Sequence, residues 1–277
     1  MGLIEFTCAV FVTSILAGML GALTGLGGGV VIVPALALLF HVDLRYAIGA
    51  SLVSVIATSS GAAVSYVREG FSNVRIGMFL EVATTLGALA GAYLTARIST
   101  HSIGILFGIT LLYSAWSTFR QQQGRAQPGH TALAEKLKLM GDYPAENGRE
   151  AYIAQNVPAG FGIMFIAGIL SGLLGIGSGA VKVLAMDHAM KLPFKVSTTT
   201  SNFMIGVTAA ASAGVYLGRG YISPGLAAPV MLGVLAGSLA GARMLVRMRV
   251  PVLRVIFVVV IVVLGVEMIY SGVTGRL

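Results

Sequence analysis

Two glycine clusters stand inside stretches that are otherwise apolar enough for a membrane helix. The first, LTGLGGGVVIVP, runs from Leu23 to Pro34, and the second, LLGIGSGAVKVL, runs from Leu173 to Leu184. Glycine weakens a helix by about 1 kcal/mol relative to alanine, so each cluster predicts a break. A helix that restarts after the break presents unpaired N–H groups and the positive end of its dipole. Each such terminus contributes about 0.3–1 kcal/mol to anion binding, so the clusters predict a small anion site.

Polar side chains beside the clusters extend this predicted site. Lys182 stands out because a lysine at bilayer depth costs about 2.5–3.5 kcal/mol on insertion scales. We weigh a position facing the anion equally against snorkelling of its ammonium group to the membrane surface. Hydroxyl and amide groups on the following helix could donate hydrogen bonds to an oxyanion. The predicted binding residues are Gly27, Gly28, Gly29, Ser51, Gly177, Ser178, Gly179, Lys182, Ser201 and Asn202.

The same residue types also have purely structural explanations. Small residues at Gly-x-x-x-Gly spacing let helices pack closely. Hydrogen bonds back to the helix's own carbonyls explain the run Thr198–Thr200 equally well. We assign close packing to the pairs Gly18 and Gly21, Gly87 and Gly91, and Gly237 and Gly241.

Ionisable residues in apolar segments are candidates for a proton relay. Four such residues occur here, namely Glu81, Asp187, His188 and Glu267. We expect Glu81 and Glu267 to lie near helix ends, where a solvated or ion-paired role is at least as good an explanation. For Asp187 and His188, between Lys182 and Lys191, we expect a structural ion pair.

The elements that must position these residues are membrane helices. Of the 277 residues, 56% are hydrophobic and only 10% are charged, and the mean hydropathy is +0.90. A soluble domain carries about 25% charged residues, so the composition predicts an all-α integral membrane protein. The single cysteine, Cys8, excludes a cysteine-cluster metal site, and we expect neither a cofactor nor a metal. We assign the net charge of +8 to membrane orientation rather than to nucleic-acid binding.

The chain consists of two copies of one unit. A shift of 150 positions aligns most of the first copy with the second without a gap, placing Gly25 on Gly175 and Gly29 on Gly179. Between the copies lies a polar stretch with a short amphipathic patch at Leu133–Leu139. We therefore expect a first transmembrane repeat at 1–119, a solvated and partly helical linker at 120–156, and a second repeat at 157–277. The start lacks the basic residues of a cleaved signal peptide, so we expect its apolar run to be retained.

The positions of lysine and arginine select a topology. The run Phe6–Phe40 would measure about 52 Å as one helix, against a hydrocarbon core of about 30 Å. If the run turns back at its glycines, thirteen basic residues fall on one side and four on the other; if it crosses, the distribution is nine against eight. The positive-inside rule favours the first arrangement, with inverted repeats, a cytoplasmic linker and both termini in the periplasm. Inverted repeats with broken or re-entrant helices are typical of secondary transporters, which work by alternating access.

The motif GxxTGxGGGxxxVPxL at Gly21–Leu36 resembles that of the TauE/SafE sulfite exporter family. The resemblance covers both halves and all but the linker. The second copy departs from it, with Ser178 in place of a glycine and Leu184 in place of the proline. The resemblance implies export of sulfite or a small organosulfonate across the bacterial inner membrane.

Other functional classes fit the sequence less well. A serine hydrolase using Ser178 and His188 would need its base within hydrogen-bond reach, and two residues so placed on one short segment are poorly arranged for this. We therefore expect no enzyme activity. A passive anion channel, or a permease for another small oxyanion, is the alternative that stays open. The expected partners are a small anionic substrate, the lipid bilayer and, through small-residue faces, a second copy in a homodimer.

Overall fold

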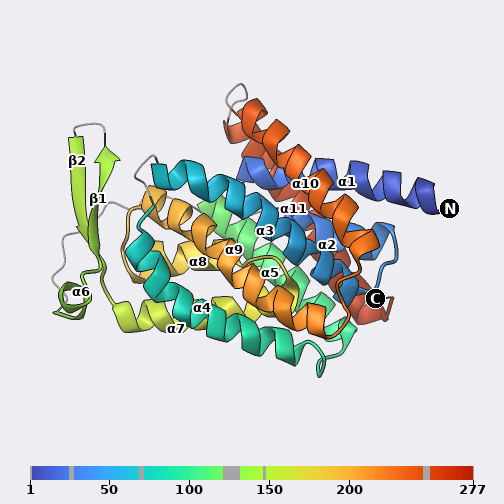
Figure 1. The fold of residues 1–277 in the computed structure, drawn as a ribbon, viewed down its shortest axis with the longest axis horizontal. Helices are drawn as coiled ribbons and strands as arrows, with labels where there is room; N and C mark the ends of the chain where they lie inside the picture. The colour runs from blue at the N-terminus through green and yellow to red at the C-terminus, as the bar shows by residue number, and fades with distance from the viewer. Residues whose placement is uncertain are drawn as a thin grey trace.

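The computed structural model describes residues 2–24, 28–68, 72–120, 132–145, 148–245 and 250–276. These ranges form a bundle of helices with a small β-hairpin at one end (Figure 1). The first half comprises α1 (Leu3–Thr24), α2 (Gly29–Pro34), the π-helix η1 (Ala35–Leu39), α3 (Leu44–Arg68), α4 (Val74–Leu94) and α5 (Thr100–Arg120). The segment between the halves forms α6 (Ala132–Lys136), β1 (Met140–Ala145) and β2 (Gly148–Ile153). The second half comprises α7 (Val157–Leu174), α8 (Gly179–Leu184), the π-helix η2 (Ala185–Ala189), α9 (Phe194–Gly218), α10 (Pro224–Leu245) and α11 (Val250–Thr274).

The two halves repeat the same series of elements. The α2–η1 segment begins at Gly29 and α8–η2 begins at Gly179, the position that the sequence alignment assigns to it. Packing between the halves is reciprocal: α1 packs on α10 and α7 packs on α4, while α3 contacts α9 and α5 contacts α11. Each half therefore completes the core of the other.

The chain reverses direction at each glycine cluster. In the first half, the Phe40 ring follows η1 and meets the Phe6 ring near the start of α1, with centroids 5.7 Å apart. In the second half, the N–H of Gln155, just before α7, donates to the carbonyl of Met190, just after η2, at 2.9 Å. Both contacts bring the end of the short returning helix beside the start of the long one. In each half, the short helix therefore packs back against the long helix that precedes it.

The loops gather at two opposite ends of the bundle. At one end, Arg45 donates to the carbonyl of Ile98 at 3.3 Å, and Arg219 donates to that of Ala92 at 2.9 Å. Both chain termini lie toward this end, and the β-hairpin lies at the other (Figure 1). Loops that the charge pattern assigned to one side of a membrane are therefore neighbours in space.

Apolar length and close helix packing agree with a membrane bundle. Among the described residues, four helices are long and apolar enough to cross a bilayer, at Ile4–Gly21, Val74–Leu94, Val157–Leu174 and Pro224–Gly241. Several glycines allow these helices to touch: a Cβ on Gly87 would collide with the carbonyl of Phe165, and one on Gly237 with that of Ile15. The predicted packing role is confirmed at these two positions and at Gly18 and Gly91.

The prediction of an all-α fold is incomplete, because β1 and β2 pair antiparallel with Met140 opposite Ile153. The sequence pair Asn147–Gly148 is a common hairpin signal, which the sequence analysis did not use. The segment is also more than a solvated connector. Leu139 and Tyr152 are buried in a cluster that includes residues of α4, α7 and α9. Asn73, which caps α4, donates to the hydroxyl of Tyr152 at 2.8 Å and so ties the hairpin to the bundle.

Candidate functional site

The two glycine turns meet inside the bundle. Ser51 on α3 donates a hydrogen bond of 2.8 Å to the carbonyl of Gly175, which ends α7 in a left-handed conformation. A Cβ on Gly29, at the start of α2, would lie 2.6 Å from Ser51 Oγ and 3.1 Å from the oxygen of Gly175. Only glycine therefore leaves room for the first turn to approach the second.

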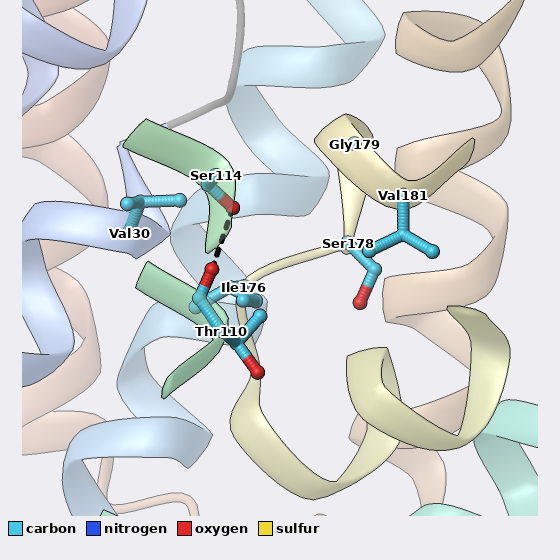
Figure 2. A pocket seen from close by; sticks show the side chains of 7 residues that line it. All are labelled: Val30, Thr110, Ser114, Ile176, Ser178, Gly179 and Val181. Carbon is cyan, nitrogen blue, oxygen red and sulfur yellow. Dashed lines mark hydrogen bonds between the residues drawn. The ribbon is translucent and has the colours of Figure 1, made fainter. Parts of the chain in front are cut away.

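A small recess, with room for about one water molecule, lies beside this meeting point (Figure 2). Its lining comes from three elements: the start of α2, the middle of α5, and the second glycine turn with α8. The lining residues are Val30, Thr110, Ser114, Ile176, Ser178, Gly179 and Val181.

Ser178 is the most unusual residue of this lining. Its backbone is left-handed, with φ +46°, although it carries a side chain. The residue is 3% exposed, and its hydroxyl has no hydrogen-bond partner among the described residues. Such backbone conformations cost about 1–3 kcal/mol and gather at functional sites. Of the buried hydroxyls without a partner among the described residues, that of Ser178 is the one that lines the recess. Both features are accounted for if this hydroxyl binds a ligand there.

Backbone N–H groups of the turn provide further donors. The first intrahelical bond of α8 runs from the N–H of Lys182 to the carbonyl of Ser178, at 3.1 Å. The N–H groups of residues 179–181 therefore have no intrahelical acceptor. The helix continues through η2 to Ala189, so the positive end of its dipole lies at Ser178. In the first half, Ile32 likewise donates to the carbonyl of Gly28 at 3.0 Å.

Thr110 and Ser114 are lining residues that the sequence analysis missed. Both lie on α5 and are buried; Thr110 donates to the carbonyl of Leu106, and Ser114 to that of Thr110, each at 2.8 Å. Their spacing of four residues places both hydroxyl-bearing side chains on one helix face. This spacing within a charge-free helix was the available signal.

Lys182 neither lines the recess nor reaches the surface. It is fully buried, and its Nζ donates to the hydroxyl of Thr208 on α9 at 2.5 Å. Thr208 in turn donates to Oε1 of Glu81 on α4 at 2.7 Å. The expectation that Glu81 lies near a helix end is wrong, because it is buried two turns into α4.

The other predicted residues lie at varied distances from the recess. Gly27 falls outside the described residues, whereas Gly28 and Gly177 are buried in the two turns. Ser201 donates to the carbonyl of Gly179 at 3.3 Å, and Asn202 is half-buried on α9. The recess thus brings together Ser178 and Gly179 from the predicted set, with Gly28, Gly29, Gly177, Ser51 and Ser201 holding the turns around it.

The structure also shows the partners of the other polar residues that the sequence analysis considered. Thr199 donates to the carbonyl of Lys195 at 2.9 Å, which confirms back-bonding for this one residue of the Thr198–Thr200 run. Thr200 instead accepts a hydrogen bond from the N–H of Asn73 at 3.1 Å. Asp187 and His188 lie 3.8 Å apart, whereas Lys182 bonds elsewhere. Glu267 is exposed on α11.

The polar groups, which come from both halves, gather around the second glycine turn rather than the first. The positions equivalent to Lys182, Glu81 and Ser114 hold Ile32, Met231 and Leu264. The first turn therefore contributes close backbone packing, and the second turn contributes the polar chemistry.

Long apolar helices packed together in one bundle define the class as a multi-pass membrane protein. The family model of the sulfite exporter TauE/SafE matches residues 10–268 of the chain, and the protein belongs to that family. The chain is 28% identical over 269 residues to the probable membrane transporter protein YunE of Bacillus subtilis (strain 168), covering 95% of this chain and 97% of that protein. It is 24% identical over 239 residues to the probable membrane transporter protein YdhB of the same organism, covering 84% and 86%. No solved structure matches the chain. The protein is thus a membrane transporter of the TauE/SafE type.

Proposed function

We propose that the protein exports sulfite or a small organosulfonate anion, which binds in the recess at the second glycine turn. The observation that carries this proposal is the buried hydroxyl of Ser178, which has no partner among the described residues and lies at the N-terminus of α8. The family membership supports a sulfur oxyanion as the substrate. An oxyanion could accept hydrogen bonds from this hydroxyl and from the N–H groups of residues 179–181.

The two halves form inverted repeats in the bacterial inner membrane in this proposal. The end with the β-hairpin faces the cytoplasm, and both termini face the periplasm. Supporting this orientation, Arg68, Arg75, Lys191 and Lys195 flank the helices that end beside the hairpin. The residues 1–119 and 157–277 act as the two repeats, and 120–156 acts as a cytoplasmic linker.

Transport proceeds by alternating access between the halves. Irregular backbone at membrane depth is tolerated where it is buried in protein or lines a cavity, as both turns are here. The recess is small in this structure, so a substrate must enter through movement of one glycine turn against α3 and α5. Rocking of one repeat against the other would open the recess to each side in turn.

The function is tested by anion flux from proteoliposomes that hold the purified protein. Vesicles are loaded with sulfite, and sulfate, methanesulfonate and chloride are added as competitors. We expect saturable sulfite efflux that methanesulfonate inhibits and that empty vesicles lack. Transport of another anion without sulfite flux would exclude the proposed substrate, and absence of any anion flux would exclude the function.

A passive anion channel is distinguished in the same vesicles. Alternating access requires a conformational cycle for each substrate, so its rate saturates with concentration. A channel would instead show a flux that rises with concentration and a conductance measurable in planar bilayers.

A further inference from the structure

A buried polar triad joins the two halves one helical turn from the recess. Lys182 on α8, Thr208 on α9 and Glu81 on α4 are linked by hydrogen bonds of 2.5 and 2.7 Å. Lys182 and Thr208 are fully buried, and Glu81 is 8% exposed. A lone charge at this depth would be costly, so the lysine and the glutamate must compensate each other.

The hydrogen bonds of the triad can accommodate both protonation states of Glu81. The hydroxyl of Thr208 has one hydrogen but two acceptors within reach, Glu81 Oε1 at 2.7 Å and the carbonyl of Met204 at 2.9 Å. When Glu81 is ionised, Thr208 and Thr85 both donate to it. When Glu81 is protonated, Thr208 can turn its hydrogen to Met204 and accept one from the carboxyl group. The second carboxyl oxygen, Oε2, is buried and has no partner among the described residues, so a proton on it would displace no existing hydrogen bond.

Few other titratable groups face this triad. The helix α7, which packs on α4, carries none between Val157 and Leu174. The remaining titratable groups on α4, α9 and η2 lie at helix ends or have partners: Arg75 and Tyr93 are exposed, Lys195 is exposed in the first turn of α9, Tyr216 donates to Gly172, and Asp187 pairs with His188. On α3 and α5, which pack against α9 and α8, the titratable groups lie in the terminal turns, apart from the exposed Tyr113. The charge state of Glu81 therefore decides whether Lys182 is compensated.

We propose that Glu81, Thr208 and Lys182 form a proton site coupled to the anion, so that one proton and one anion are carried in the same direction. This inference rests on the proposed anion transport. When Glu81 is ionised, it neutralises Lys182 and the neighbouring recess attracts an anion weakly. When Glu81 takes a proton from water, an O–H bond forms, the charge of Lys182 is uncompensated, and the anion restores neutrality. The proton leaves to water on the opposite side after the anion is released.

Thermodynamic reciprocity gives the coupling its sign. If protonation of Glu81 increases anion affinity, anion binding must increase the proton affinity of Glu81 by the same factor. Couplings of this kind are about 5–150-fold, so anion affinity should be higher by that order when Glu81 carries a proton. The triad predicts symport; exchange of an anion for a proton would have the opposite sign.

The test uses methanesulfonate, whose charge is constant across the working pH range. Sulfite is unsuitable because it takes up and releases a proton itself in that range. Wild-type protein is reconstituted into vesicles containing a pH-sensitive dye, and an outward methanesulfonate gradient is applied. We expect methanesulfonate efflux to be accompanied by proton efflux, which makes the vesicle interior more alkaline. The Glu81→Gln variant, which mimics the protonated state, should move the anion without protons and with a flat pH profile. Glu267→Gln, at an exposed glutamate of α11, is the matched control and should behave as the wild type.

A second variant keeps the proposal testable if Glu81→Gln does not fold. Glu81→Gln combined with Lys182→Met removes both charges at similar volume and should fold, transport weakly and move no protons. Anion efflux without proton movement in the wild type, or with equal proton movement in Glu81→Gln, would overturn the coupling and leave the proposed function intact. Absence of anion flux in the wild type would overturn both.

Discussion

Ser51 and Gly175 are 124 residues apart in the chain, yet the Ser51 hydroxyl donates a 2.8 Å hydrogen bond to the Gly175 carbonyl. The serine belongs to a helix of the first half, and the glycine begins the turn of the second half. This bond fixes the second turn against the first, where Gly29 approaches most closely. Movement of the second turn relative to α3 would therefore break this hydrogen bond.

Replacing Ser51 by alanine should destabilise the protein. The carbonyl of Gly175 would be left buried without this donor, at a cost of about 1–3 kcal/mol. Denaturation of the purified protein in detergent measures the change. Ser60→Ala on the same helix removes an exposed hydroxyl that bonds its own helix, and it should have little effect. Equal stability of the two variants would mean that the bond between the halves contributes nothing.

Gly29→Ala should impair both stability and transport. The added Cβ would lie 2.6 Å from Ser51 Oγ, 2.9 Å from Val55 and 3.1 Å from the Gly175 oxygen, so the turns must separate. Overpacking of this kind costs about 1–3 kcal/mol. The control is Gly214→Ala on α9, where a Cβ would meet nothing within 4 Å. Thermal denaturation and sulfite efflux should both distinguish the two variants, and wild-type behaviour of Gly29→Ala would contradict the close approach of the turns.

Ser178→Gly should make the protein more stable and a poorer transporter. Glycine adopts the left-handed conformation at this position without the side-chain penalty, which is worth about 1 kcal/mol or more, and it removes a buried hydroxyl. The substrate would lose one hydrogen-bond donor. Ser178→Ala separates the two effects, because it removes the hydroxyl while keeping a side chain in the strained conformation. A rise in melting temperature with unchanged sulfite efflux would show that the hydroxyl has no role in transport.

Asn73→Ala should loosen the β-hairpin from the bundle. Asn73 accepts a hydrogen bond from the N–H of Ile76 and donates to Tyr152 and to the carbonyl of Met140. Loss of the helix cap costs about 1 kcal/mol, and loss of the donated bonds should reduce hydrogen-exchange protection in β1 and β2. Asn73→Asp keeps the capping oxygen and removes the donor, so it should lower protection in the hairpin while sparing α4. Unchanged hairpin protection in both variants would show that Asn73 does not hold it.

The repeated architecture could be predicted from the sequence because it depends on local signals. Glycines weaken a helix wherever they occur, and the match of Gly29 with Gly179 places equivalent helix starts in both halves. Length and charge predict a reversal of the chain at each cluster, because a 35-residue apolar run is too long for a single span.

The side-chain arrangement of the site could not be predicted in the same way. Whether Lys182 faces the recess or bonds toward Glu81 depends on how α8 and α4, more than 80 residues apart in the chain, both pack against α9. Thr110 entered the site for a similar reason, because nothing near it in the sequence shows that α5 contacts the second turn. Contacts of this kind follow from tertiary packing, not from local patterns.

Equilibrium binding of sulfite to the purified protein tests the central claim, that an anion binds at the second glycine turn, most directly. Isothermal titration calorimetry should show one sulfite bound per chain in the wild type and in Gly214→Ala. In Ser178→Ala the affinity should fall roughly 10- to 150-fold, as expected for loss of one hydrogen bond to a charged group. Unchanged affinity in Ser178→Ala, or no sulfite binding in the wild type, would contradict the account.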